Sequence, residues 1–177
     1  MNNERLTWIN SVGGPLILIE KRLVLAWHGN SVPAEANSPS NNVYQTDYDR
    51  ACAVHDYLGV IPVAHGEALV LGDEPMQTAW IALSEQEGLL VRWQWATDES
   101  SVVKALRGLA AQSWETEDFV FSTETSDLMI FDAAFAGDEI DTNRPVTLSP
   151  GVHSLDTGYC RPDDETSLIL HRLRRKM

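Results

Sequence analysis

Short apolar or alternating runs, separated by turn residues, are the sequence feature that most restricts how this chain can fold. Runs of this length are typical of β-strands, because a helix of ordinary length needs a longer periodic segment. The first run, from Leu16 to Ile19, begins directly after Gly13-Gly14-Pro15, whose residues favour a turn. The predicted strands are residues 16–19, 22–27, 60–63, 68–71, 78–83, 89–95, 119–122, 128–131, 146–148, 151–157 and 167–173.

The run from Leu89 to Trp95 alternates in polarity, and alternation places successive side chains on opposite faces of a strand. Leu89, Val91, Trp93 and Trp95 share one face, which we predict to be buried. Arg92 lies on the other face, which we predict to be exposed to solvent. Strands of this kind are typical of antiparallel sheets with one covered face.

Two short helices are predicted from capping residues and apolar spacing. Asp47 is a suitable N-cap for a helix over residues 48–58, and Ser100 or Ser101 for a second helix that runs to Ala110. Helices this short need a larger element to pack against. The predicted fold is therefore α+β and β-rich, with antiparallel sheets in a sandwich-like arrangement and two short helices.

A chain of 177 residues fits a single domain that takes in residues 1–177. A faint internal similarity, between the stretches that begin at Glu67 and at Ser126, raises the hypothesis of two similar halves. These halves would be residues 8–97 and 114–173, joined by a helix near residues 100–112.

The formal net charge is −13, and no Lys or Arg occurs from Gly108 to Asn143. Such a field repels nucleic acid and anionic membranes and attracts a basic protein surface. The alternative is that the acidity only keeps the protein soluble. The basic end of the chain, from Arg172 to Lys176, either docks on the acidic body or hangs free.

The sequence predicts a cytoplasmic protein. It opens with a polar segment rather than a secretory signal, and no apolar run approaches the roughly 20 residues that a membrane-spanning helix needs. Cys52 and Cys160 lie far apart and suggest reduced thiols rather than a disulfide framework. The segment 29–42, rich in Ser, Asn and Pro, is predicted to be a surface loop.

The sequence contains no glycine-rich phosphate loop, no Gly-x-Ser-x-Gly elbow and no His-Glu-x-x-His motif. His65-Gly66-Glu67 has the spacing of a deaminase motif, but the later pair of cysteine ligands which that chemistry requires is missing. Cys52 and His55 could share a helix face, yet two ligands do not make a metal site. We therefore predict no catalytic residue, no metal and no cofactor, and a protein that binds rather than catalyses.

Six tryptophans are many for this length, and large aromatic side chains dominate both protein cores and interfaces. Trp93 and Trp95 are assigned to the core. Trp8 and Trp114 lie among polar residues at the edges of predicted elements, where either could serve the core or contact a partner.

Four motifs stand out in the first part of the chain. They are Trp8-x-x-Ser11-x-Gly13-Gly14-Pro15-Leu16, Asp47-Tyr48-Asp49-Arg50-Ala51-Cys52, Ala68-Leu69-Val70-Leu71-Gly72-Asp73-Glu74-Pro75 followed by Thr78-Ala79-Trp80, and Leu90-Val91-Arg92-Trp93. Together they resemble family 21 of the predicted immunity proteins of bacterial polymorphic toxin systems. The resemblance covers roughly residues 8–95 and continues only in looser features such as Leu170-His171-Arg172-Leu173. The motif residues assigned to structure are Trp8, Gly13, Gly14, Pro15, Gly72, Asp73, Glu74, Pro75, Trp80 and Trp93.

This resemblance implies a small cytosolic protein that binds and blocks a cognate toxin and so protects the producing cell and its kin. It carries over no known catalytic or contact residue. The charge pattern adds the hypothesis that the acidic segment, with a nearby aromatic residue, covers the site of a toxin with a basic surface. The predicted partner-binding residues are Trp114, Glu115, Glu117, Asp118, Glu124, Asp127, Asp138, Glu139 and Asp141.

Two other function classes stay open: a regulatory or chaperone-like protein-binding module, and an enzyme whose site is assembled only by the fold. A neighbouring toxin gene would favour immunity over the first. A deep pocket with perturbed ionisable groups would favour the second. Nothing in the sequence gives the oligomeric state.

Overall fold

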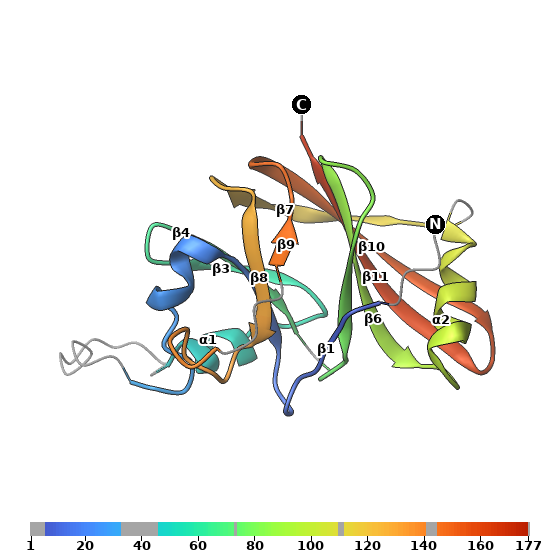
Figure 1. Cartoon of the computed structure of the whole chain (residues 1–177), viewed down its shortest axis with the longest axis horizontal. Coiled ribbons are helices and arrows are strands. Elements are labelled where there is room, and N and C mark those ends of the chain that lie inside the picture. The colour runs from blue at the N-terminus through green and yellow to red at the C-terminus, as the bar shows by residue number, and fades with distance from the viewer. Residues whose placement is uncertain (1–5, 33–45, 73, 110–111, 141–144, 177) are drawn as a thin grey trace.

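The computed structural model describes residues 6–32, 46–72, 74–109, 112–140 and 145–176. In this part of the chain it contains two antiparallel sheets, which confirms the predicted β-rich α+β fold (Figure 1). In spatial order, the large sheet contains β1 (Trp8–Ile9), β5 (Thr78–Ala82), β6 (Glu87–Trp95), β11 (Thr166–Arg175), β10 (Gly151–Asp163) and β7 (Glu115–Thr123). The small sheet contains β3 (Gly59–Val63), β4 (Gly66–Leu71), β2 (Leu16–Glu20), β8 (Asp127–Asp132) and β9 (Pro145–Thr147).

The two sheets pack face to face over a shared hydrophobic core. Leu18 and Leu69 of the small sheet lie in one cluster with Leu90, Phe121 and Leu155 of the large sheet, and all of these side chains are fully buried. The sandwich-like arrangement arises because each strand turns alternate side chains toward the opposite sheet.

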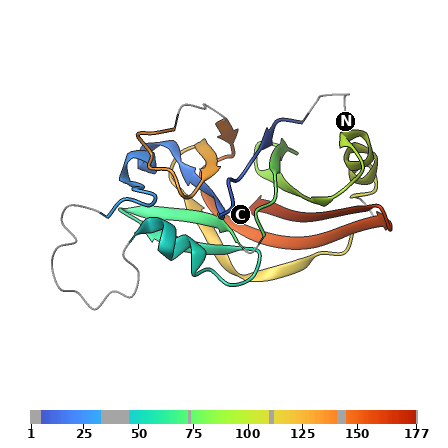
Figure 2. The ribbon, with the colours of Figure 1, turned by 90° about the horizontal axis from the view of Figure 1, so that it is seen from below.

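Helices cover the outer faces of both sheets. The 3-10 helix η1 (Lys21–Ala26) and helix α1 (Asp47–Cys52) pack on the small sheet, and α2 (Glu99–Leu106) packs on the large sheet. In two perpendicular views α1 lies at one end of the molecule and α2 at the other (Figure 1, Figure 2). Because both faces of the small sheet are covered, all five residues of β2 are buried, and the strand reads as a continuous apolar run.

The prediction that β6 has one solvent face is wrong. Arg92 is only 1% exposed and lies on the inner face of the strand with Leu90, opposite the small sheet. Alternation placed Leu89 correctly on the other face, but α2 covers that face as well. The assignment of Trp95 to the core is also wrong: it lies at the end of β6, beyond the covered part, and is 40% exposed.

The segment predicted as a strand over residues 22–27 is the 3-10 helix η1. Its buried side chains, Leu23 and Val24 with Trp27 just beyond, have a helical rather than an alternating spacing. The Trp27 amide donates to the carbonyl oxygen of Val24 at 3.0 Å, which closes the last turn.

The two predicted α-helices exist with different bounds. α1 ends at Cys52, well before the predicted end, and its N-cap is Thr46, which forms a capping box with Asp49. A left-handed residue, Asp56 with φ of 68°, turns the chain away from any helical continuation toward β3. α2 begins with Asp98 as its N-cap, because that carboxylate accepts the Ser101 amide at 2.8 Å.

Both sheets contain strands from both parts of the chain. The large sheet takes β1, β5 and β6 from before α2 and β7, β10 and β11 from after it, and the small sheet is divided in the same way. The two predicted halves therefore share one core, and their similarity stays a prediction. Among the described residues, none of the helices has the length and apolar character needed to cross a membrane.

The basic end of the chain docks on the body as the last part of β11. Arg172 and Arg174 lie 3.0 and 2.9 Å from the same oxygen of Asp156, which is 1% exposed. Burial by itself raises the pKa of Asp156, but hydrogen bonds from Thr116 and Arg172 and the charge of Arg174 outweigh it, so the pKa lies below its ordinary value.

Arg92 joins the large sheet to two loops of the small sheet. Its guanidinium donates to the carbonyl oxygens of Tyr57 at 2.9 Å, Gly72 at 2.7 Å and Glu74 at 2.9 Å. It also lies 5.7 Å from the centre of the Tyr57 ring. A buried cation needs such partners because burial removes its water shell. One side chain therefore fixes both the α1–β3 connection and the β4–β5 connection.

We expect Arg92→Met to lower the free energy of unfolding by about 2–4 kcal/mol, because it leaves carbonyl groups of two connections without their donor. Urea denaturation followed by circular dichroism measures this change. Arg107→Met, at an exposed position, is the matched control and should stay within about 0.5 kcal/mol of the wild type. Equal stability of both variants would show that the Arg92 contacts do not hold the sheets together.

Candidate binding surface

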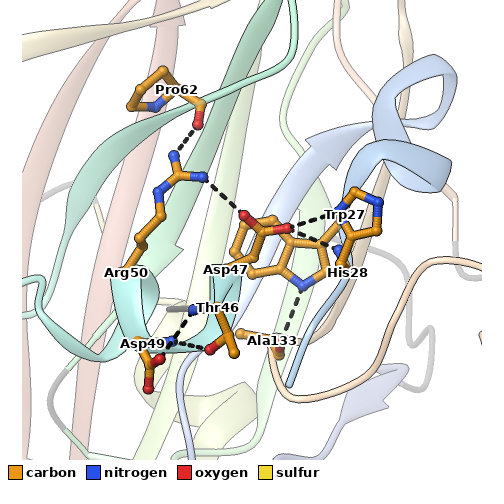
Figure 3. A network of polar contacts seen from close by, with 8 residues as sticks. All are labelled: Trp27, His28, Thr46, Asp47, Asp49, Arg50, Pro62 and Ala133. Carbon is orange, nitrogen blue, oxygen red and sulfur yellow. Dashed lines mark hydrogen bonds and ion pairs between the residues drawn. The ribbon is translucent and has the colours of Figure 1, made fainter. Parts of the chain in front are cut away.

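Helix α1 is fixed to the small sheet by a polar network (Figure 3). The Asp47 carboxylate accepts the His28 amide at 2.8 Å and the Arg50 guanidinium at 2.8 Å. Arg50 also donates to the carbonyl oxygen of Pro62 on β3. These contacts position the start of the connection that carries Asp56 and Tyr57 to the edge of the core.

Five residues at that edge form what we call the tyrosine surface: Asp56, Tyr57, Glu115, Glu117 and Tyr159. They come from the α1–β3 connection, β7 and β10, and thus from both sheets. Tyr159 is 57% exposed and its ring meets that of Tyr57 edge to face, with 6.2 Å between ring centres and 69° between planes. Partial burial and then the neighbouring Tyr57, Glu115, Glu117 and Asp56 raise the pKa of Tyr159, so its phenol is neutral at pH 7.

A chain of hydrogen bonds leads from this surface into the core. The Thr157 hydroxyl donates to Glu117 at 2.5 Å and lies 2.9 Å from Nδ1 of His171. This assigns the His171 proton to Nδ1, and the buried Nε2 has no hydrogen-bond partner among the residues that the structure describes. Complete burial, and then the charge of Arg92, lower the pKa of His171 to about 3. His171 is therefore neutral at physiological pH.

Gly72 sets the position of the Asp56–Tyr57 turn. A Cβ at Gly72 would lie 2.8 Å from the backbone oxygen of Asp56, and the Gly72 amide donates to the backbone oxygen of Tyr57 at 3.1 Å. Only glycine allows this approach. Asp56 itself adopts a left-handed conformation that Asp and Asn tolerate better than other side chains.

An open cleft of about 640 Å³ borders Glu74, whose carbonyl oxygen accepts a hydrogen bond from Arg92. Trp93 and Gln94 of β6 line it together with Ser11 and with the Glu74-Pro75 turn. Trp8 packs against Trp93 at 5.2 Å between ring centres. Residues that carry the family resemblance thus gather around one cleft, although they are far apart in the sequence.

Several motif residues have contacts that support a structural role. A Cβ at Gly14 would lie 2.5 Å from the Tyr48 hydroxyl, and Gly13 has φ of 129°. The Trp80 ring occupies the space beside Gly88, where a Cβ would lie 1.9 Å from it. Asp73 lies outside the described residues. Glu74 and Pro75 are exposed on a turn whose backbone Arg92 holds.

The predicted partner-binding residues fall in separate regions. Glu115 and Glu117 belong to the tyrosine surface, whereas Trp114 packs under Arg172 at 4.3 Å and Asp118 lies by alternation on the outer side of β7.

The other members of this set lie elsewhere. Glu124 and Asp127 lie at the β7–β8 turn, at the opposite end of β7 from Glu115. At about 3.4 Å per residue, the two ends of this strand are roughly 27 Å apart. Asp138 and Glu139 lie in the loop after β8, and Asp141 is outside the described residues. The described acids of this set are therefore spread over the start of β7, the β7–β8 turn and the loop after β8 rather than gathered in one cluster.

His65 and Glu67, which have deaminase spacing, lie at the β3–β4 turn beside a pocket of about 330 Å³. The Glu67 carboxylate accepts the Ser122 amide at 2.9 Å, and the buried Glu20 accepts the amides of Glu124 and Thr125. These carboxylates hold β7 and the turn after it. In the part of the chain that the structure covers, no three or more His, Cys, Asp or Glu side chains are placed to hold a metal ion.

Sequence reasoning missed Asp56, Tyr57 and Tyr159. Tyr57 was placed inside a predicted helix, and Tyr159 lies beyond the predicted end of its strand, because β10 continues to Asp163. Single tyrosines so far apart form no motif, and only the pairing of the two sheets brings them together.

Comparison with known proteins agrees with the resemblance. The family model of Immunity protein 21 matches residues 7–166, a range that runs from β1 to the start of β11, and the chain belongs to this family. No curated protein and no solved structure matches the chain.

The neutral state of His171 makes stability depend on pH. The folded pKa of about 3 lies below the ordinary 6.5, so the unfolded chain binds the proton first and stability is lost as pH falls from about 7 to 4. We expect His171→Gln to remove this contribution, which amounts to about 3 kcal/mol between those pH values. The measurement is the difference in unfolding free energy between variant and wild type at both pH values.

Other groups whose pKa changes on folding, such as His153, whose pKa is lowered by burial, are present in both proteins and cancel in that difference. His55→Gln, at an exposed position, is the matched control and should keep the wild-type pH dependence. A His171→Gln protein with the wild-type slope would contradict the assignment of a buried, neutral imidazole.

Proposed function

We propose that this immunity protein acts in the cytoplasm of the producing cell, where it binds and neutralises the cognate toxin of a bacterial polymorphic toxin system through an acidic surface. The family supplies the role, and the charge pattern supplies the mode of recognition. The observation that carries the proposal is the absence of Lys and Arg from Gly108 to Asn143 together with the exposure of the acids in that window. Among the described residues of this window, the exposed acids are Glu115, Asp118, Glu124, Asp127, Asp138 and Glu139.

Binding rather than catalysis is supported by what the buried ionisable groups do. Arg92 donates to three backbone carbonyls, Asp156 holds two arginines, and Glu20 accepts two amides of the β7–β8 turn. Each of these groups is engaged in holding strands and loops in place. Exposed carboxylates, in contrast, can be reached by a basic partner, although Glu124 already lies 3.1 Å from Arg22 and Glu139 accepts the Ala136 amide at 3.1 Å.

An acidic surface suits a toxin whose active site is basic, as a site for nucleic acid would be. Long-range attraction raises the association rate, and carboxylates placed over the site exclude the substrate. The partner in this proposal is therefore a toxin domain with a basic surface, and neither nucleic acid nor a membrane takes part in binding.

Co-expression with the toxin domain encoded beside this protein tests the proposal. We expect growth to be rescued and the two proteins to co-purify. Charge reversal then locates the surface, because the three exposed pairs lie in different regions: Glu115→Lys with Asp118→Lys, Glu124→Lys with Asp127→Lys, and Asp138→Lys with Glu139→Lys. At least one double variant should bind at least tenfold more weakly, with a flatter salt dependence.

Asp164→Lys with Glu165→Lys changes the charge equally at an exposed turn outside the window and is the matched control. Circular dichroism of each variant verifies that it folds. If all four double variants bind alike, the toxin docks without the acidic surface. If the wild type neither rescues growth nor co-purifies, immunity by direct binding is wrong, and a regulatory or chaperone-like role takes its place.

A further inference from the structure

We infer that the tyrosine surface is a recognition site for one cationic side chain, Lys or Arg, of the toxin, with the exposed ring of Tyr159 as its platform. This inference rests on the proposed function and names the contact within it.

Tyr159 is a large aromatic side chain that is exposed on β10. It is 57% exposed, although its neighbours Thr157 and Gly158 on β10 are buried. Tyr57 supports it from one side through the edge-to-face contact. Tyrosine is enriched among the residues that dominate binding energy, because it offers a large rigid surface with few torsions to fix.

The charge around the ring is negative. Asp56 and Glu115 are exposed and Glu117 is half-buried. Glu115 pairs across the sheet with Thr157, two residues before Tyr159, and Glu117 accepts a hydrogen bond from the Thr157 hydroxyl. Asp56 directly precedes the Tyr57 that contacts Tyr159. A cation over the face of a tyrosine, with carboxylates at the rim, gains from the ring quadrupole and from direct ion pairs. An acidic or apolar side chain of the partner would gain neither the attraction to the ring nor the ion pairs. Charge complementarity therefore selects a cationic occupant.

Within the described part of the chain, the nearby cations Arg92, Arg161 and Arg172 are engaged elsewhere. Arg92 lies beneath Tyr57, directed at backbone carbonyls of the core. Arg161, two residues after Tyr159, has its guanidinium 5.4 Å from the centre of the Trp95 ring. Arg172 lies over Trp114 and is paired with Asp156.

The site is held in shape before a partner arrives. Arg92 and Gly72 fix the backbone of Tyr57, and the hydrogen bond from Thr157 fixes the Glu117 carboxylate. A preorganised site loses little side-chain entropy on binding. Rigid support therefore makes this pair of rings a suitable anchor for a side chain of the partner.

The test compares variants of Tyr159 in the purified complex with the cognate toxin domain. Tyr159→Ala should raise the dissociation constant about tenfold or more, because it removes the platform. Tyr159→Phe keeps the ring face and should bind within about threefold of the wild type. Tyr159→Leu keeps apolar bulk without the quadrupole and should resemble Tyr159→Ala.

Glu115→Gln isolates the rim charge: it should weaken binding and flatten its salt dependence. Phe135→Ala, at another aromatic side chain of similar exposure (45%), is the control and should bind as the wild type does. Thermal unfolding of each variant shows that its fold is intact.

The outcomes separate the two proposals. A wild-type complex whose affinity is unchanged by Tyr159→Ala overturns this inference and leaves the proposed function standing. Equal losses for Tyr159→Phe and Tyr159→Ala overturn the role of the ring face and assign binding to the hydroxyl instead. No complex with the wild-type protein overturns the proposed function and the inference together.

Discussion

A buried guanidinium on the central strand of the large sheet is the interaction on which the rest of this structure depends. Arg92 is removed from water, and the carbonyl oxygens of Tyr57, Gly72 and Glu74 replace its hydration shell. Those carbonyls belong to the two connections that border the small sheet, so the charge can be satisfied only when both sheets are in register. An unsatisfied buried cation is costly, and this cost favours one arrangement of the loops over others.

The tyrosine surface and the adjoining cleft are both formed by connections that Arg92 holds in place. The connection held by Arg92 carries Tyr57 to Tyr159, and the second connection presents Glu74 and Pro75 at the adjoining cleft. The same positive charge, together with burial, keeps His171 neutral, so the hydrogen bonds from His171 through Thr157 to Glu117 do not add a second cation to the core. A rigid interior thus sets the geometry of the tyrosine surface, where, under the proposed function, a basic partner would meet an aromatic ring and carboxylates.

Much of the fold could be predicted from the sequence, because turn residues delimit short apolar runs and strand alternation is local. The burial of Arg92 could not, since alternation tells which side chains share a face but not whether another layer covers that face. The segment that became η1 was mistaken for a strand because it is short and apolar, and only its burial reveals the helical spacing. The acids of the second part of the chain were visible as a charge pattern, yet their distribution over both ends of β7 depends on tertiary structure. The tyrosine pair left no local signal, because the two sheets must pack before Tyr57 and Tyr159 meet.

Hydrogen exchange of the free and toxin-bound protein, followed by mass spectrometry, tests the central claim most directly: that the partner docks on the surface which Arg92 supports. Exchange slows where backbone amides become covered on binding, and the result does not depend on any substitution. The account predicts that protection on binding is greatest in residues 53–59, 112–118 and 157–161, which meet at the tyrosine surface. Protection confined to residues 123–127 or 133–140, with these three segments unchanged, would place the toxin on a different face and contradict the account.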